Sequence, residues 1–324
     1  GAIGYLIGEE NRGLEYMFVM MNAARFAVGV QGIAVAERAY QQAVAYAKDR
    51  LQSRDVAGSS GAVPIIRHPD VRRMLMTMRA HTEAARALAC VAAAASDAGH
   101  HAADEAARRE NMAVYEFLVP IVKGWSTEMS LEVTSLGVQV HGGMGFVEET
   151  GAAQHYRDAR ILTIYEGTTA IQANDLIGRK TARDGGAVAR ALIAKVRETE
   201  AQLSARGGAD LTAIAGRLSA GRAALEAAVD FMARAFKGDV RAAFAGSVPY
   251  LKLAGVVLSG WQMARAALAA DELLKAGDGD AEFLAAKIAT ARFHADHLLT
   301  QAGGLLSAAT EGAVGVLAMP ETAF

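Results

Sequence analysis

The stretch that decides the fold is residues 14–51, LEYMFVMMNAARFAVGVQGIAVAERAYQQAVAYAKDRL. It contains no proline, and its apolar residues recur with the 3.6-residue period of an α-helix. A helix of this length, in a chain with only 5 prolines among 324 residues, predicts a bundle of long helices. The residues expected on its apolar face are Leu14, Phe18, Met21, Phe26, Val30, Ile33 and Ala36, with Glu37, Arg38, Lys48 and Asp49 on another face.

The rest of the chain shows the same helical pattern, and strand patterns are almost absent. Abundant alanine and the 3.6-residue period therefore predict an all-α protein. The sequence Asp184-Gly185-Gly186 breaks the pattern, so we expect a second helical bundle to begin near residue 185. The further helices expected in the first bundle are residues 70–98, 102–140 and 168–181, after a loop at 53–64.

Composition limits the classes of function. The chain carries 33 basic and 35 acidic residues, a net charge of −2, so no overall basic field recruits nucleic acid or anionic lipid. No apolar run is expected to reach the roughly 20 residues that a membrane-spanning helix needs. The single cysteine, Cys90, excludes an intrachain disulfide and is interpreted as a small core residue. A lone cysteine suits a reducing compartment, and we expect a cytoplasmic protein.

The most informative short motif is YEGTTAIQ at residues 165–172. Glu166 stands among apolar neighbours, and Gly167 allows the backbone to approach a ligand closely. The alternative is structural, because an acidic residue is favoured in the first turn of a helix, with Thr168 as its N-cap. The neighbours expected to desolvate Glu166, and so to make it a stronger general base, are Ile161, Leu162, Ile164 and Tyr165.

Two further motifs precede this one, QVHGGMGF at residues 139–146 and YRDARI at 156–161. In their order and spacing, the three motifs resemble the acyl-CoA dehydrogenase family, in which they end the flavin-binding helical domain. The resemblance implies a helical bundle that binds FAD and oxidises an acyl-CoA thioester to the trans-2-enoyl-CoA. The runs MMNAAR at 20–25 and HPDVRRML at 68–75 resemble long-form bacterial members, which include enzymes for 3-methylthiopropionyl-CoA.

The family resemblance begins with the first residues. GYLIGEENRGL at residues 4–14 is similar to the exit from the family's middle β-domain, so we interpret the chain as the C-terminal portion of a longer enzyme. The expected organisation is a β-domain remnant at 1–13, the helical dehydrogenase domain at 14–184 and a helical extension at 185–324. Because the N-terminal domain and most of the β-domain are missing from this organisation, we expect the chain to fold as helices but to be inactive and colourless.

The resemblance implies a role for each matching residue at the substrate end. Glu166 matches the family's base, which removes the α-proton while a hydride leaves the β-carbon for the flavin. Some members carry the base on the first long helix, before an arginine, but here Ala24 precedes Arg25 and cannot accept a proton. The residues implied to bind substrate are Asn22, Arg25 and Gly167. The alternative for Arg25 is a side chain that extends from apolar surroundings to solvent.

The implied cofactor contacts match the family less evenly. Arg50 matches an arginine that binds the pyrophosphate of a flavin held by the neighbouring subunit, a role that suits a forked cation. His68 matches a flavin-contacting position, but Pro69 replaces the usual glutamine, and the link after Arg50 is longer than usual. The other residues implied to contact FAD are Gln139, Gly142, Gly143 and Thr168.

The resemblance also implies partners, and three alternatives stay open. The implied electron acceptor is an electron-transfer flavoprotein, and the implied assembly is a homodimer or homotetramer. An acyl-CoA oxidase is the alternative of the same class. A DNA-binding relative, with arginine clusters at 72–73, 108–109 and 217–241, and a catalytically silent assembly module are the others. His294 and His297 share a helix face but lack a third ligand, so no metal site is expected.

Overall fold

The computed structural model describes all 324 residues, apart from the side chain of Val19. The described chain is all-α and has no β-strand beyond one isolated bridge between Leu51 and Pro64. The first bundle consists of α1 (Gly13–Asp49), α2 (Pro69–His101), α3 (Glu105–His141), α4 (Gly143–Phe146), α5 (Ala152–Leu162), α6 (Thr169–Asp175) and a π-helix (Leu176–Ala182). The second consists of α7 (Ala187–Arg206), α8 (Ala209–Gly238), α9 (Val240–Ala245), α10 (Ser247–Ala276), α11 (Ala281–His297), α12 (Ala302–Thr310) and α13 (Ala313–Ala318). Short 3-10 helices lie at Ile65–Arg67, Glu148–Thr150, Leu299–Gln301 and Glu321–Ala323.

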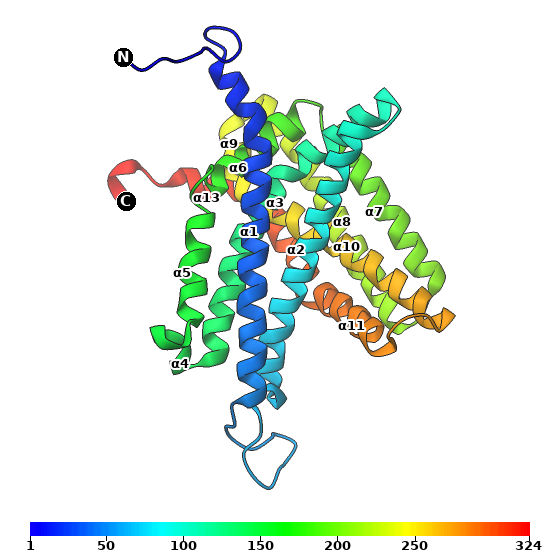
Figure 1. Ribbon diagram of the computed structural model, residues 1–324. Coiled ribbons are helices and arrows are strands. Elements are labelled where there is room, and N and C mark those ends of the chain that lie inside the picture. Colours follow the sequence, from blue (N-terminus) through cyan, green and yellow to red (C-terminus); the bar gives the residue numbers. More distant parts are fainter.

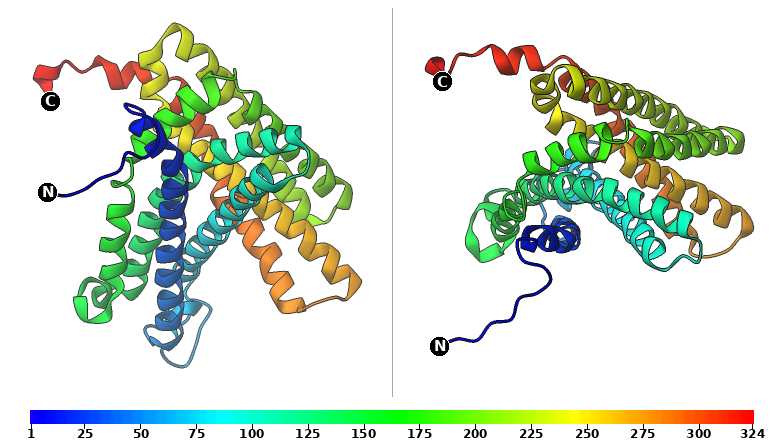
Figure 2. Two further views of the ribbon diagram at one scale, coloured as in Figure 1. Left: turned by 45° about the horizontal axis from the view of Figure 1, so that its top comes forward. Right: turned by 90° about the horizontal axis from the view of Figure 1, so that it is seen from above.

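The three longest helices of the first bundle, α1, α2 and α3, lie side by side, and α5 packs against α1 and α3 (Figure 1). The second bundle lies on the other side of α2 and α3 from α1 (Figure 2). Helix α10 joins the bundles, because it packs against α2, α3 and α6 as well as against α8 and α11. The two bundles therefore share one hydrophobic core.

Small residues form the contact between α1 and α3. A Cβ atom added at Gly29 would lie 2.6 Å from the carbonyl oxygen of Val122, and one at Gly32 would lie 3.1 Å from that of Ser126. The buried residues that continue this face of α1 are alanines, at 36, 39, 43 and 47. The two helix backbones can approach closely only because these side chains are absent or short.

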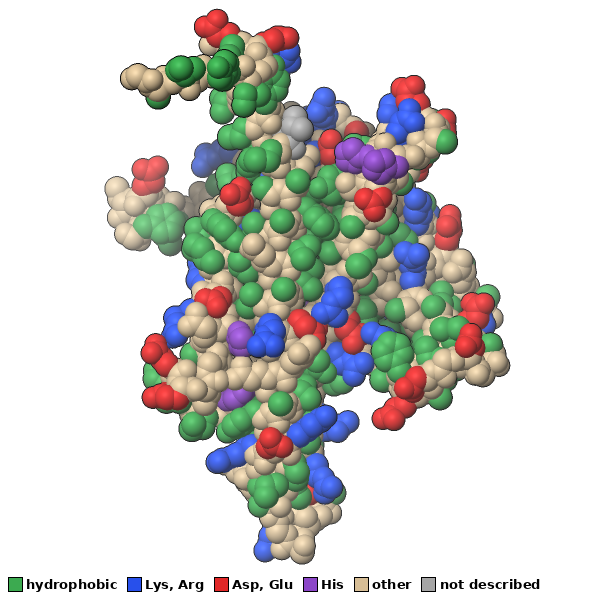
Figure 3. Space-filling model, viewed as in Figure 1, with side chains coloured by type: hydrophobic (Ala, Val, Ile, Leu, Met, Phe, Trp, Pro, Cys, Tyr) green, Lys and Arg blue, Asp and Glu red, His purple; other side chains and the backbone are tan. Residues whose placement is uncertain are grey.

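The apolar face expected for α1 is partly wrong. Ile33 and Ala36 are buried as expected, but Leu14, Phe18 and Val30 are 70%, 43% and 41% exposed. Large side chains cannot enter the close contact with α3, so they point away from it. Hydrophobic side chains consequently gather on the outer surface of α1 (Figure 3).

Cys90 is exposed and is not the core residue that we expected. Its neighbours Leu88, Ala89 and Ala92 define the buried face of α2 at this level, and Cys90 does not share that face. The buried face of an alanine-rich helix is difficult to predict from sequence, because small residues occur on both of its sides.

Two helices, α1 and α10, are long and apolar enough to cross a membrane, contrary to our expectation from sequence. The relevant window of α10 is 78% buried inside the protein, as in the core helix of a bundle. The window of α1 is only 29% buried, because its large apolar residues lie on the outer surface. Length and composition alone are weak grounds for assigning a membrane span.

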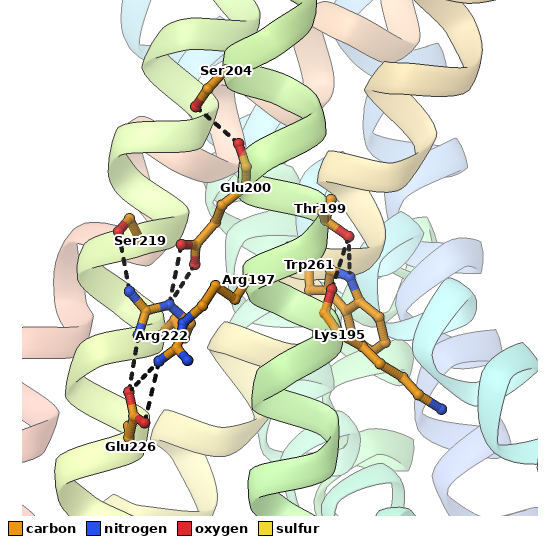
Figure 4. Close-up of polar contacts among 9 residues, drawn as sticks. All are labelled: Lys195, Arg197, Thr199, Glu200, Ser204, Ser219, Arg222, Glu226 and Trp261. Carbon is orange, nitrogen blue, oxygen red and sulfur yellow. Dashed lines mark hydrogen bonds and ion pairs between the residues drawn. The ribbon is translucent and has the colours of Figure 1, made fainter.

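Polar side chains tie the helices of the second bundle together (Figure 4). The Arg222 Nε of α8 donates to both carboxylate oxygens of Glu200 on α7, at 2.8 and 3.1 Å, and its Nη1 donates to Glu226 at 2.9 Å. The Trp261 indole N–H of α10 donates to the hydroxyl of Thr199 on α7 at 2.7 Å. Each of these buried or half-buried polar groups therefore has a partner on another helix or one turn along its own.

Glycine also allows α10 to dock against the first bundle. A Cβ atom added at Gly255 would lie 2.2 Å from the indole ring of Trp125 on α3. A Cβ atom added at Gly124, the preceding residue on α3, would lie 2.7 Å from Leu251. The bundles are thus joined through two glycines, each facing a large side chain of the other helix.

Candidate active site

Glu166 lies in a tight turn, residues 163–168, between α5 and α6. The turn is closed by a hydrogen bond from the Thr169 N–H to the Thr163 carbonyl at 3.1 Å, and the Thr168 side chain caps α6 by accepting from the Ile171 N–H. Glu166 has φ 56°, and Gly167 has φ 91°. A positive φ is uncommon for a residue other than glycine, so surrounding contacts must hold Glu166 in this conformation.

The structural alternative is confirmed for Thr168, which is the N-cap of α6, but it is wrong for Glu166, which precedes the first turn of α6 and has a left-handed backbone. The expected desolvation is also wrong within this chain. The Glu166 side chain is exposed, and Ile161 and Ile164 beside it are 50% and 46% exposed. Leu162 is buried, but it is held in the core below the turn. Any apolar cover for the carboxylate must therefore come from outside these residues.

The backbone of the turn is bound from below by Lys123 of α3. Its Nζ donates to the carbonyl oxygens of Leu162, at 2.9 Å, and Gly167, at 2.6 Å. Gln172 of α6 adds hydrogen bonds from its Nε2 to the carbonyl oxygens of Glu166, at 3.4 Å, and Gly167, at 3.2 Å. Both side chains are fully buried.

The charge of Lys123 is affected by its surroundings. Burial, with a smaller contribution from nearby Arg25, lowers the pKa of Lys123 to about 8, while Glu128 and Glu166 act in the opposite direction. Sequence reasoning missed this residue. The signal was a single lysine inside the apolar run FLVPIVKGW at residues 117–125, where an unpaired charge would be costly.

Arg25 is buried rather than extended to solvent, so the alternative interpretation of this residue is wrong. Its Nη1 donates to the Asp175 carboxylate at 3.3 Å, and Asp175 also lies 3.3 Å from the Nε of Arg179. Asn22, one turn earlier on α1, is half-buried. Asp175 ends α6, the helix that begins directly after the Glu166 turn, so this pair places Arg25 at the same end of the bundle as the turn.

A second group of expected residues meets at the far end of α1. Arg50, which follows α1, lines an open cleft of about 630 Å³ with His68 and the turn after α3. Gly142, with φ 62°, has open space where a side chain would begin, as does Gly143. Five of the residues that line the cleft are expected cofactor contacts: Arg50, His68, Gln139, Gly142 and Gly143.

The longer link after Arg50 forms part of this cleft. The Gln52 N–H donates to the Val63 carbonyl at 3.1 Å, which closes the base of the loop. The His68 Nε2 lies 2.8 Å from the Gln52 carbonyl oxygen, so this ring atom is already engaged by the loop. Pro69 begins α2. In this conformation only the other ring nitrogen of His68 is left for a ligand.

Thr168 is not brought together with the other expected cofactor residues. The Tyr165 hydroxyl, two residues before Gly167, donates to Gln31 of α1. Gln31 precedes Arg50 by 19 residues, and at about 1.5 Å per residue this is roughly 28 Å along the helix. The structure therefore has two separate groups, one around Glu166 and one around the cleft at Arg50.

Comparison with known proteins identifies the family. Residues 11–181 match the family described as "Acyl-CoA dehydrogenase, C-terminal domain", more than half of the chain. The chain belongs to the acyl-CoA dehydrogenase family. Residues 192–320 match "Acetyl-CoA dehydrogenase C-terminal like". Both groups of site residues lie within the first match, while the domain boundary that we expect near residue 185 stays a prediction.

The chain is 58% identical over 301 residues to 3-methylmercaptopropionyl-CoA dehydrogenase of Ruegeria pomeroyi, covering 93% of this chain and 51% of that protein. It is 35% identical to a broad-specificity linear acyl-CoA dehydrogenase of Mycobacterium tuberculosis, covering 92% and 51%. The crystal structure of an acyl-CoA dehydrogenase complexed with FAD from Bacillus anthracis has the same fold, with a TM-score of 0.72 at 20% identity over 98% of this chain and 53% of that one. The chain thus spans about half the length of the relatives it matches.

Proposed function

We propose that this chain supplies the catalytic base and part of the flavin site of an enzyme that oxidises an acyl-CoA thioester to the trans-2-enoyl-CoA. The observation that carries the proposal is the Glu166 turn, where an exposed carboxylate is held on a left-handed backbone above buried hydrogen bonds. The 58% identity to 3-methylmercaptopropionyl-CoA dehydrogenase supports that thioester as the first substrate to test.

The cleft at Arg50 fits the pyrophosphate and adenine end of FAD. Arg50 offers a forked cation for a phosphate, and the open backbone at Gly142 and Gly143 leaves room for close approach of a dinucleotide. Gln139 supplies a polar side chain at the cleft. When bound, FAD accepts the hydride that leaves the β-carbon of the substrate.

Glu166 and the residues around it accept the proton of the substrate and bind the negative charge that develops on it. A carboxylate oxygen of Glu166 accepts the α-proton of the thioester, which is only weakly acidic. The N–H of Glu166 donates to no group of the described chain, so it is free to bind the thioester oxygen as negative charge develops there. Arg25, with Asn22 on the same helix, lies at this end of the bundle, and its charge is balanced by Asp175.

The separation of the two groups supports a homo-oligomer. We propose that Thr168 lies near one cofactor and Arg50 near another, because the roughly 28 Å along α1 between the two groups suits an assembly related by two-fold symmetry. Each chain then contributes to two flavin sites. The exposed apolar surface of α1 supports the same assembly, because monomers rarely leave such a surface uncovered. An electron-transfer flavoprotein is the proposed acceptor, and the cytoplasm the proposed location.

The test is Glu166→Gln in the complete enzyme. Glutamine keeps the size of the side chain but cannot accept the proton, so we expect bound flavin and a fall of about 10³-fold in the rate of flavin bleaching by the acyl-CoA. Glu148→Gln, at an exposed glutamate paired with Arg157, is the matched control and should bleach at the normal rate. A Glu166→Gln enzyme that retains more than about a tenth of the rate would assign the base elsewhere.

A further inference from the structure

We propose that Lys123 is the positioning residue of the turn at residues 163–168. Lys123 holds Glu166 in its left-handed conformation by binding one carbonyl group before Glu166 and one after it. This inference rests on the proposed role of Glu166 as the base. Lys123 touches neither the carboxylate nor the expected position of the substrate, because it is fully buried below the turn. It acts through the backbone.

The two hydrogen bonds bracket the strained residue. The Leu162 carbonyl comes four residues before Glu166 and the Gly167 carbonyl one residue after it, and the Nζ of Lys123 binds both. An ammonium has three donors on a flexible stem, so one side chain can join two points of a turn. Without this bridge, the Leu162 carbonyl would lose its partner and the Gly167 carbonyl would keep only the longer bond from Gln172, at 3.2 Å. A left-handed glutamate would then relax toward a more favourable φ.

Binding the carbonyls also determines where the N–H groups point. The N–H and C=O of a trans peptide point in opposite directions. The Glu166 carbonyl faces Gln172, and the Gly167 carbonyl faces both Gln172 and Lys123. The N–H groups of the following residues, Gly167 and Thr168, therefore point away from the bundle. The turn therefore presents hydrogen-bond donors, and not acceptors, to the side on which we expect the substrate.

A lysine is suited to this position by its charge as well as by its reach. Burial and, to a smaller extent, Arg25 lower the pKa of Lys123 to about 8, whereas Glu128 and Glu166 favour the ammonium form. Glu128 is linked to the same turn, because the Thr169 hydroxyl donates to its carboxylate. Charge on Lys123 strengthens its bonds to the carbonyls, since hydrogen bonds from an ionised donor are the stronger kind.

The experiment uses the complete, flavin-loaded enzyme and the variant Lys123→Met, which keeps a long side chain but removes all donors. We expect kcat to fall about 100-fold with KM changed less than about threefold, because the base is misplaced while the rest of the substrate site remains. Amide hydrogen exchange in residues 163–169 should become at least about tenfold faster. Lys180→Met is the matched control, at a largely buried lysine that pairs with Glu116 instead, and should change neither quantity.

A second variant covers the case in which Lys123→Met does not fold. Gln172→Met removes the weaker pair of hydrogen bonds to the turn, and the Oε1 of Gln172 has no partner to lose. We expect it to accelerate exchange in the same segment, with a loss of about tenfold in kcat. Normal exchange at residues 163–169 in both variants, or in Lys123→Met alone, would overturn the inference.

The outcomes also separate this inference from the proposed function. If Glu166→Gln is fully active while Lys123→Met loosens the turn, the proposed base is wrong but the structural role of Lys123 stands. If Glu166→Gln is inactive while Lys123→Met keeps normal kcat and normal exchange, the base is right and the positioning role is wrong.

Discussion

Lys123, buried in the first bundle, and Arg222, largely buried in the second, are two cations held in opposite ways. Lys123 in the first bundle donates only to backbone carbonyls, whereas Arg222 in the second binds the carboxylates of Glu200 and Glu226. The first arrangement fixes a turn that carries an exposed glutamate. The second fixes one helix against another and leaves no comparable strained residue, since the described non-glycine residues with positive φ all lie before α7.

The two arrangements have different effects on the stability of their bundles. A buried ammonium without a hydrogen-bonded carboxylate opposes folding, and the lowered pKa of Lys123 reports that cost. Arg222 and Glu200, both largely buried, compensate each other. We therefore interpret the first bundle as partly shaped by its site and the second mainly as support for it.

The largest expected effect is in the second bundle. Arg222→Met leaves the Glu200 carboxylate largely buried and unpaired, so the free energy of unfolding should fall by about 3–5 kcal/mol. Urea denaturation of the chain measures this. The double variant Arg222→Met with Glu200→Leu should recover to within about 1 kcal/mol of the wild type, since it removes both charges. A single variant as stable as the wild type would mean that the pair does not support the bundle.

A smaller effect concerns the pH dependence of the first bundle. The pKa of Lys123 is about 8 in the folded chain against 10.5 for an ordinary lysine. Above pH 8 the unfolded chain binds more protons than the folded one, so stability rises with pH until about pH 10.5, by up to about 3 kcal/mol. Urea denaturation at several pH values should show this rise in the wild type and in Arg222→Met, and lose it in Lys123→Met. Equal pH dependence of stability in the wild type and both variants would mean that a group other than Lys123 causes the rise.

The smallest effect tests the joint between the bundles. Gly255→Ala places a methyl group against the rigid indole of Trp125, so we expect a loss of about 2 kcal/mol from overpacking. The control is Gly216→Ala on α8, where a methyl group meets open space and helix propensity should add up to about 1 kcal/mol. Thermal unfolding followed by circular dichroism distinguishes the two. Equal melting temperatures for both variants would show that the joint can adjust without cost.

Much of the fold could be predicted from sequence, because long uninterrupted helical periodicity is a local property. The all-α class is confirmed, and the long helices lie close to their expected ranges. The packing face of α1 could not be predicted in full. Periodicity shows which residues share a face, but not whether Gly29 and Gly32 or the larger Phe18 and Val30 meet the next helix. That choice depends on the side chains of α3.

The candidate site shows the same limit. The family resemblance, and no local property of the residues, implied that the residues of the cleft group from Arg50 to Gly143 contact the same cofactor, and in the structure they line one cleft. Sequence could not show that Asp175 pairs with Arg25 or that Lys123 supports Glu166, because these contacts depend on how distant helices pack. The roles of the site residues, their FAD contacts and the acyl-CoA chemistry stay predictions.

The Arg25–Asp175 pair has a consequence for the order of folding. Its two residues are 150 positions apart in the chain. Closing so long a loop carries a large entropic cost that only prior docking of the intervening helices can offset. We therefore expect the pair to form late, after α1 and α3 have packed, and during synthesis only once the chain beyond Asp175 has left the ribosome. The Glu166 end of the bundle should then be among the last parts of the first bundle to become ordered.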